Sequence, residues 1–343
     1  MAESSSAAPL DRPCPFRALL ARNLPGARPQ DLRSPAANLR SEWPAWTPPG
    51  GRVRKGAIVE PELIADYQCV CGEGPLWHPM EKRLYWTDIP TGRMFRYDPV
   101  TGTHEQFYQG EVVGGFTIQA DGSLLLFMAR GAVKQWRDGA LTTVVEEIPA
   151  ERESRFNDVI ADPMGRVYCG TMPTPSGPGR LYLLDNDGSI SLLLEGVGCS
   201  NGLGFTPDRK GLYHTDTRKR EITLYYYDAA TGAITGPRVA IRTPEGEGAP
   251  DGMTVDAEGF IWTAKWGGGC AVRYAPDGNE DRRIHFPARK VSCVTFGGEG
   301  YDEMYVTTAG GDQKEADGAG AGALFRVRPG MRGVPEFLSR VCL

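Results

Sequence analysis

Hydrophobic and polar positions along this chain repeat as a unit of two short apolar runs joined by a polar turn. In "RFNDVIADPMGRVYCGTM", residues 155–172, three polar side chains precede an apolar run, and Asp162, Pro163 and Gly165 separate it from a second run. Short apolar runs bounded by such turn residues predict two β-strands joined by a tight turn.

The same unit occurs six times. The other five are "GEGPLWHPMEKRLYWTDI", "GGFTIQADGSLLLFMA", "SNGLGFTPDRKGLYHTDT", "PDGMTVDAEGFIWTAKW" and "SCVTFGGEGYDEMYVTTA". Their second runs centre on Leu84, Leu124, Val167, Leu212, Ile261 and Met304, a spacing of roughly 40–50 residues that is typical of propeller blades. Further strand patterns such as "RLYLLDNDGS" and "HEQFYQ" supply a third and a fourth strand. The sequence therefore predicts an all-β fold, a six-bladed β-propeller.

The two ends of the predicted domain, residues 60–343, are expected to close the ring. Residues 60–69 should add an outer strand to the last blade, whose own strands should end near "EFLSRV", residues 336–341. Closure of this kind removes free sheet edges. Residues 1–59 are rich in Ala, Arg, Pro and Ser without a strand pattern, so we expect a flexible N-terminal extension there.

Charge and cysteine usage narrow the class of protein. The net charge of −5 predicts no nucleic-acid partner, and the lack of an 18-residue apolar stretch predicts no membrane partner. The N-terminal residues do not have the pattern of a secretory signal. The eight cysteines form no CxxC pair and have no nearby His, so we expect reduced thiols in a cytoplasmic protein. We expect a monomer or a small homo-oligomer.

Equivalent positions of the repeat predict a cation site. About ten residues before each second-run centre the chain carries Glu73, Gly114, Asn157, Asn201, Asp251 and Cys293. In a propeller these positions meet around one mouth of the central channel. Four oxygen-bearing side chains without imidazole or thiolate donors suit a hard cation such as Ca²⁺, Mg²⁺ or Mn²⁺. Asn and Asp beside Gly are also ordinary turn residues, but their shared register favours a site.

At these residues the chain resembles the SMP-30/gluconolactonase/LRE family. The matching stretches include "CGEGPLWHP", "RFNDVIADPMGRVYCGTM", "SNGLGFTPD" and "PDGMTVDAEGFIW". The resemblance implies that Glu73, Asn201 and Asp251 bind one divalent metal ion, with calcium expected and Mg, Mn, Zn or Fe as alternatives. It also implies that Arg155 and Asn157 contact the substrate. The loop at residues 173–179, "PTPSGPG", lacks an acidic residue that some animal members carry there, so their substrate preference is not transferred.

The resemblance implies a metal-dependent lactonase that opens sugar lactones, such as gluconolactone, to aldonic acids. Asp251 is our candidate for the catalytic proton acceptor. Arg155 is suited to hold substrate hydroxyls or the developing oxyanion, although an ion pair with Asp158 or Glu153 is a structural alternative.

Two other functions stay open, a phosphotriester or organophosphate hydrolase and a non-catalytic calcium-binding protein. The absence of a G-x-S-x-G motif argues against a serine esterase of the α/β-hydrolase type. We expect His78 and His214 to be structural, and the loop at residues 311–323 to be mobile and to border the mouth.

Overall fold

The computed structural model describes residues 59–342 of the chain. The predicted N-terminal extension lies outside these residues except for Val59, and its boundary stays a prediction. No helix in the described part of the chain has the length and apolar character needed to cross a membrane.

Four sheets have four antiparallel strands each, in sequence order. The first contains β2 (Gly72–His78), β3 (Arg83–Asp88), β4 (Arg93–Asp98) and β5 (Thr103–Gln109). The second contains β6 (Val113–Ile118), β7 (Leu124–Met128), β8 (Val133–Arg137) and β9 (Ala140–Val145). The third contains β10 (Phe156–Ala161), β11 (Val167–Thr171), β12 (Gly179–Leu184) and β13 (Ile190–Val197). The fourth contains β14 (Ser200–Phe205), β15 (Gly211–Asp216), β16 (Glu221–Tyr227) and β17 (Ile234–Arg242).

The remaining strands form one eight-stranded sheet. One half contains β18 (Ala249–Val255), β19 (Ile261–Trp266), β20 (Cys270–Tyr274) and β21 (Glu280–His285), and the other contains β22 (Lys290–Gly297), β23 (Glu303–Ala309), β24 (Ala323–Val327) and β1 (Glu62–Asp66). A single register pair, Trp266 with Lys290, joins the two halves. The strand predicted within residues 60–69 is thus present, as β1 paired antiparallel with β24.

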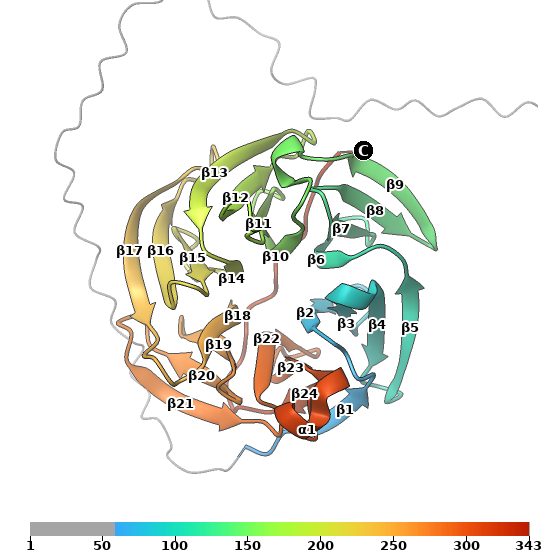
Figure 1. Cartoon of the computed structure of the whole chain (residues 1–343), viewed down its shortest axis with the longest axis vertical. Helices are drawn as coiled ribbons and strands as arrows, with labels where there is room; N and C mark the ends of the chain where they lie inside the picture. Colours follow the sequence, from blue (N-terminus) through green and yellow to red (C-terminus); the bar gives the residue numbers. More distant parts are fainter. Residues whose placement is uncertain (1–58, 343) are drawn as a thin grey trace, which may run out of the picture. The chain divides into compact units, whose positions relative to one another are not determined.

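The sheets stand around a common centre, and the first strand of each repeat lies nearest to it (Figure 1). This arrangement confirms the prediction of an all-β, propeller-like fold. The structure differs from the predicted six separate blades, because it has four separate four-stranded sheets and one eight-stranded sheet. The prediction that the last strands end near residues 336–341 is wrong, because β24 ends at Val327.

The turns follow the predicted chemistry. Between β10 and β11, the Gly165 amide donates to the Asp162 carbonyl at 2.9 Å, and the Met164 amide donates to Asp162 Oδ1 at 2.8 Å. Gly165 has a φ of 92°, which is accessible to glycine at little steric penalty. Asp162 and Gly165 therefore fix the hairpin that the sequence predicts.

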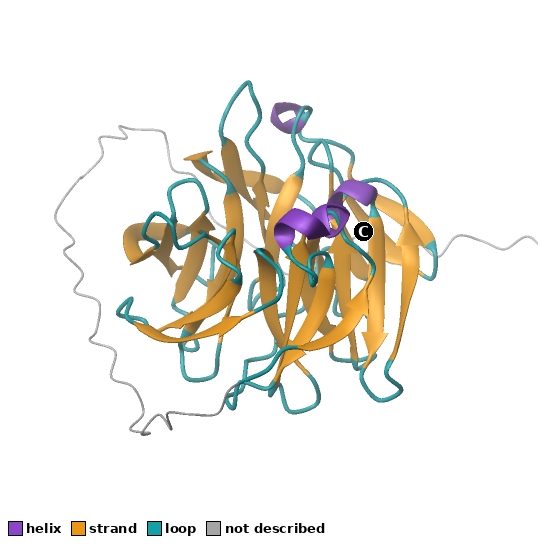
Figure 2. Ribbon diagram, turned by 60° about the horizontal axis from the view of Figure 1, so that its bottom comes forward, coloured by secondary structure: helices purple, strands orange, loops and turns teal. Residues whose placement is uncertain are grey.

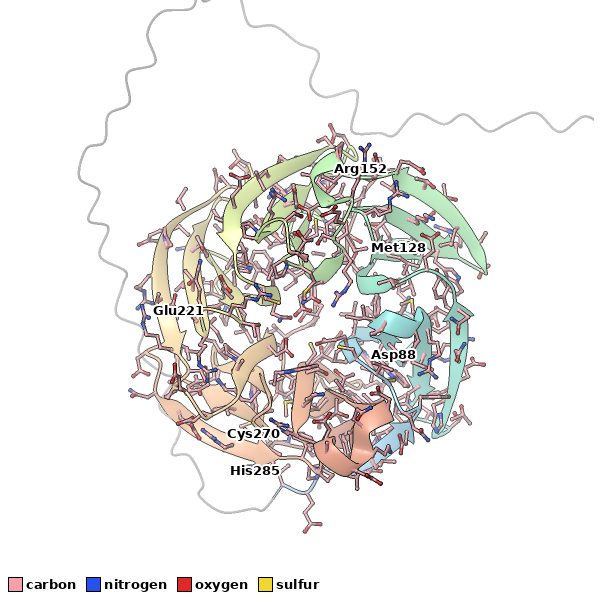
Figure 3. All side chains as sticks on the ribbon, viewed as in Figure 1. Asp88, Met128, Arg152, Glu221, Cys270 and His285 are labelled. Carbon is pink, nitrogen blue, oxygen red and sulfur yellow. The ribbon has the colours of Figure 1, made fainter. Side chains whose placement is uncertain are left out.

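The core is divided into layers between neighbouring sheets, where side chains fill the space (Figure 3). In one layer, Leu125 and Phe127 of β7 pack with Phe156 of β10 and Val167 of β11. The rings of Phe127 and Phe156 meet edge to face with centroids 5.4 Å apart. Since burial of such apolar side chains drives folding, these layers hold the sheets around the channel.

The two ends of the channel differ. Helices η2 (Ile89–Thr91), η3 (Pro149–Glu151), η4 (Gly311–Gln313) and α1 (Lys314–Asp317) lie on one face, which we call the mouth face (Figure 2). The chain after β24 instead crosses behind the centre of the ring (Figure 1). The loop expected to be mobile contains η4 and α1, and Asp317 there is buried and pairs with Lys290 at 2.6 Å. Whether this segment moves stays a prediction.

Most described cysteines agree with the expectation of reduced thiols. Six are free, namely Cys69, Cys71, Cys169, Cys199, Cys270 and Cys293. Cys342 is disulfide-bonded, so the expectation fails at that position.

Candidate active site

The innermost strands bring the predicted site residues to the mouth end of the channel. Glu73 lies on β2, Asn157 on β10, Asn201 on β14 and Asp251 on β18. The pairing of each of these strands with the second strand of its repeat is interrupted at or beside the site residue. Such β-bulges re-aim side chains and are common next to active sites. The bulges therefore break the regular alternation of side chains at the site positions.

Contacts between neighbouring innermost strands bring these residues together. Asn157 Nδ2 donates to Asn201 Oδ1 at 2.7 Å. The Thr217 hydroxyl, which accepts from Asn201, donates to the Pro250 carbonyl at 2.8 Å, one residue before Asp251. On the remaining side of the ring, Ser292 Oγ donates to the Gly72 carbonyl at 2.5 Å, next to Glu73.

The other two positions of the repeat are occupied by small residues that allow close packing. A β-carbon at Gly114 would lie 1.9 Å from the Phe156 carbonyl oxygen. Cys293 packs its sulfur against Gly252, where an added β-carbon would lie 2.3 Å from Sγ. These two positions therefore help to close the ring and provide no oxygen side chain.

Three acidic side chains share this region with one guanidinium group. Burial raises the pKa of Glu73, and the charges of Asp251 and Asp158 raise it further. Burial and the charge of Asp158 raise the pKa of Asp251, and burial raises that of Asp158 to about 7. Arg155 acts in the opposite direction on all three. The site thus holds more negative charge than its own cation compensates.

This charge surplus fits a divalent cation. Glu73 is 3% exposed and Asp251 is 4% exposed, and within residues 59–342 no side-chain hydrogen bond to the Asp251 carboxylate is present. Buried carboxylates without a partner are unfavourable, whereas oxygen ligands of this kind are those that Ca²⁺ or Mg²⁺ takes. Glu73, Asn201 and Asp251 are therefore suited to hold such an ion. The same described residues contain no metal-binding group of three His, Cys, Asp or Glu side chains, so a cation bound here would also need a ligand of another type, such as the Asn201 amide oxygen.

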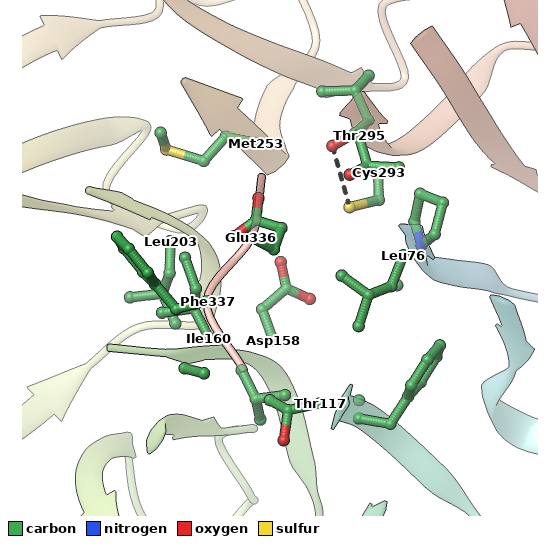
Figure 4. A pocket seen from close by; sticks show the side chains of 17 residues that line it. Leu76, Thr117, Asp158, Ile160, Leu203, Met253, Cys293, Thr295, Glu336 and Phe337 are labelled. Carbon is green, nitrogen blue, oxygen red and sulfur yellow. Dashed lines mark hydrogen bonds between the residues drawn. The ribbon is translucent and has the colours of Figure 1, made fainter. Parts of the chain in front are cut away.

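Sequence reasoning missed Asp158 as a member of the site. It treated Asp158 only as a structural partner of Arg155, and no ion pair between the two is present among the described residues. Asp158 instead points into the channel cavity (Figure 4). In a regular strand, Asn157 and Asp158 would face opposite sides. The register shift between Phe156 and Val159 removes that alternation, and no local sequence signal marks it.

Arg155 is oriented by its own strand. Its Nη1 donates to Asn157 Oδ1 at 2.7 Å and to the Phe156 carbonyl at 2.8 Å. Glu153, the other structural partner considered, instead accepts from Ser176 Oγ at 2.7 Å. A guanidinium held by one of its nitrogens keeps further N–H groups for a ligand.

Both histidines predicted to be structural have protein partners. His78 lies at the far end of β2, where Nε2 contacts the Gly122 carbonyl at 3.0 Å. His214 Nε2 lies 2.8 Å from Ser200 Oγ, and burial lowers the pKa of this imidazole to about 4. His214 is therefore neutral at physiological pH and engaged with Ser200.

A small cavity of about 70 Å³ lies along the innermost strands, with Asp158 at its centre (Figure 4). Its walls include apolar side chains such as Leu76, Ile160 and Leu203, and the C-terminal segment contributes Glu336 and Phe337. Glu73, Asn201 and Asp251 are not among the residues that line it. The cavity thus adjoins the cation-site residues, and Asp158 belongs to both regions.

Residues 333–341, which we call the C-terminal strap, close the far end of the channel. Ser339 Oγ lies 2.8 Å from Thr117 Oγ1 of β6, and the Arg340 amide donates to the Gly165 carbonyl at 2.7 Å. Phe337 packs on Phe205 of β14, with ring centroids 5.7 Å apart. The strap thus contacts several sheets instead of adding a strand to one.

Comparison with known proteins identifies the family. Residues 71–310 match the family described as the SMP-30/Gluconolactonase/LRE-like region. The chain is 50% identical over 287 residues to the pentonolactonase XacC of Haloferax volcanii, covering 82% of this chain and 98% of that protein. It is 34% identical over 275 residues to a 6-deoxy-6-sulfogluconolactonase of Pseudomonas putida, covering 78% and 94%, respectively.

A solved structure supports the same assignment. The calcium-binding protein regucalcin from Agrobacterium tumefaciens superposes with a TM-score of 0.76 at 26% identity, covering 82% of this chain and 98% of that one. The family match spans nearly all the innermost strands that carry the site. The chain therefore belongs to the SMP-30/gluconolactonase/LRE-like family.

Proposed function

We propose that this protein is a lactonase that hydrolyses sugar lactones to the corresponding aldonic acids, with one divalent cation held by Glu73, Asn201 and Asp251. Relatives named as a pentonolactonase and a 6-deoxy-6-sulfogluconolactonase support the reaction class. The observation that carries the site assignment is a set of three neighbouring carboxyl groups, the buried Glu73 and Asp251 and the half-buried Asp158. Arg155 balances their charges only in part.

A bound divalent cation would polarise the lactone carbonyl and lower the pKa of water. Asp251 accepts a proton from the water that attacks the carbonyl carbon, as a general base. The bond between the carbonyl carbon and the ring oxygen then breaks, and the ring oxygen takes up a proton to become the hydroxyl of the aldonic acid. Arg155 donates hydrogen bonds to the negatively charged oxygen or to substrate hydroxyls. Asn157 holds Arg155 in place through its Oδ1 and lies beside the substrate.

Calcium is the cation we propose. The donors are carboxylate and amide oxygens, which suit Ca²⁺ better than Zn²⁺ or Fe²⁺. The related regucalcin of known structure is described as calcium-binding. Magnesium and manganese take similar ligands and are the next candidates.

We also propose that the eight-stranded sheet represents two blades, so that the propeller has six. The two halves of that sheet each repeat the four-stranded antiparallel order of the other sheets, and only Trp266 and Lys290 join them. With six blades, β1 completes the last one with a strand from the other end of the domain. The cytoplasmic location and the monomeric or small oligomeric state stay predictions.

A non-catalytic calcium-binding role is the alternative with a specific observation behind it, the description of the related regucalcin. The test measures ring opening of gluconolactone and a pentonolactone, with a fluorophosphate ester as the competing substrate class. Each is assayed with bound metal, after chelation and after reloading. We expect lactone hydrolysis that chelation abolishes and reloading restores. No hydrolysis of any lactone with any divalent ion would contradict the proposal.

A further inference from the structure

The amide groups at the mouth form one continuous chain of hydrogen bonds. Arg155 Nη1 donates to Asn157 Oδ1 at 2.7 Å, and Asn157 Nδ2 donates to Asn201 Oδ1 at 2.7 Å. Asn201 Nδ2 then donates to Thr217 Oγ1 at 2.7 Å, and the Thr217 hydroxyl donates to the Pro250 carbonyl at 2.8 Å. We call these five residues the amide chain. It connects the third and fourth sheets to β18, which carries Asp251.

The chemistry of its two ends fixes the direction of every bond in the amide chain. Arg155 has only donors and the Pro250 carbonyl is only an acceptor. A flip exchanges the oxygen and the nitrogen of an amide. If Asn157 alone were flipped, its NH₂ group would face the N–H of Arg155, and if Asn201 alone were flipped, its NH₂ group would face that of Asn157. The observed orientation therefore leaves the Asn201 oxygen, not its nitrogen, on the side of Asn157.

We propose that Thr217 is a positioning residue that holds the Asn201 carbonyl oxygen ready to bind the cation. An amide oxygen has two lone pairs. Asn157 uses one of those on Asn201, and the second is left for an ion. The Thr217 hydroxyl uses its only hydrogen in the bond to the Pro250 carbonyl, so toward Asn201 it can act only as an acceptor. It therefore selects the amide orientation in which the Asn201 nitrogen faces Thr217 and the oxygen faces Asn157. This inference rests on the proposed cation site.

The backbone around Thr217 is well placed for this task. Thr217 directly follows β15, and its amide donates to the Cys199 carbonyl at 3.1 Å, two residues before Asn201. The preceding residue, Asp216, accepts from the amides of Gly198 and Cys199 at 2.8 and 3.1 Å. These bonds tie the start of β14 to the end of β15, so the hydroxyl of Thr217 and the amide of Asn201 keep a fixed relation.

The test compares divalent-ion affinity by calorimetry in Thr217→Val, Thr217→Ser and a matched control, Thr215→Val. Thr215 lies two residues away on β15, and its buried hydroxyl has no hydrogen-bond partner among residues 59–342, so its loss should be nearly neutral. The full-length protein is stripped with a chelator and titrated with Ca²⁺ and, separately, Mn²⁺. Loss of a residue that orients a ligand typically weakens metal binding by about 10–100-fold.

We expect Thr217→Val to weaken ion binding by about 10-fold or more, and Thr217→Ser and Thr215→Val to bind like the wild type. The lactonase assay should show a reduced rate at limiting ion that recovers when excess ion is added. Wild-type affinity in Thr217→Val, or equal weakening in Thr215→Val, would overturn the role of Thr217 while leaving the proposed function intact. A wild-type protein that binds no divalent ion would overturn both.

Discussion

The two ends of the propeller channel are built from the same innermost strands but have opposite character. At the mouth end, Glu73 and Asp251 are buried, and within residues 59–342 Arg155 offsets their charges only in part. At the far end, Phe337 and Leu338 of the C-terminal strap pack into apolar clusters of two different sheets. The far end gains stability from its contacts, whereas the metal-free mouth end retains a repulsion that a ligand can relieve. In this fold, the proposed chemistry and the stabilising contacts of the strap lie at different ends of one channel.

The largest effect is expected from Asp251→Asn, which removes a carboxylate from the mouth end. The variant should lose about 10³-fold in lactonase kcat, because the substitution removes the proton acceptor and an anionic ligand together. Its metal-free form should unfold at a higher temperature than the metal-free wild type at pH 7.5, because one member of the repelling group is now neutral. Activity and thermal unfolding are measured on the same stripped and reloaded samples.

Asp302→Asn is the matched control, since Asp302 is exposed in the turn between β22 and β23 at the far end. It should leave activity and metal-free stability unchanged. Equal activity of the Asp251→Asn variant and the wild type would show that the mouth end has no catalytic carboxylate at position 251.

A smaller effect is expected from Arg155→Lys. Lysine keeps the positive charge but lacks the planar guanidinium group with its several N–H donors. Its ammonium group can therefore no longer donate hydrogen bonds to Asn157 and to a substrate oxygen in the same geometry. We expect kcat/KM for gluconolactone to fall about 10²-fold, the range for loss of one oxyanion donor. Arg152→Lys is the control, because Arg152 is exposed on the mouth face and pairs with Glu147. Similar small losses in both variants would remove Arg155 from the site.

Phe337→Ala tests the far end. The ring packs edge to face on Phe205 and lies under the Arg209 guanidinium, 5.2 Å away. Its removal from this half-buried position should lower the free energy of unfolding by about 2 kcal/mol, measured by urea denaturation. The KM for lactone and the affinity for the ion should stay at wild-type values, because Phe337 lines a cavity that does not include Glu73, Asn201 or Asp251. A change in ion affinity as large as the loss of stability would show that the two ends are coupled.

The smallest effect concerns Glu336, the acidic residue of the strap. Burial raises the pKa of its carboxyl from 4.5 to about 7, against a hydrogen bond from Thr254 that lowers it. Since the folded state holds the proton more tightly than the unfolded state, this stabilising contribution is complete below pH 4.5 and is lost as the pH rises toward 7.

Glu336→Gln should remove that dependence. Between pH 5 and 8 the wild type should lose on the order of 1 kcal/mol relative to the variant. Thermal unfolding of both proteins across this range gives the difference directly. A constant difference at all pH values would show that Glu336 does not take up a proton in the folded state.

The repeat made much of the fold and the positions of the site residues predictable from the sequence. Turn residues such as Asp162 and Gly165 act locally, and the shared register of Glu73, Asn201 and Asp251 reflects the symmetry of a ring. By contrast, Asp158 enters the channel through a β-bulge, a property of strand pairing that leaves no mark on the local pattern. The apolar residues of "EFLSRV" suggest a strand, yet each packs in a different hydrophobic cluster between the sheets. A pattern of burial alone cannot distinguish these two arrangements.

The central claim is that one divalent ion at Glu73, Asn201 and Asp251 is required for lactone hydrolysis. Its most direct test is to titrate ion into chelator-stripped protein and record bound metal and gluconolactone hydrolysis on the same samples. The account predicts that activity rises in proportion to bound metal and saturates at one ion per chain. Full hydrolysis by metal-free protein, or saturation with metal without any hydrolysis, would contradict it.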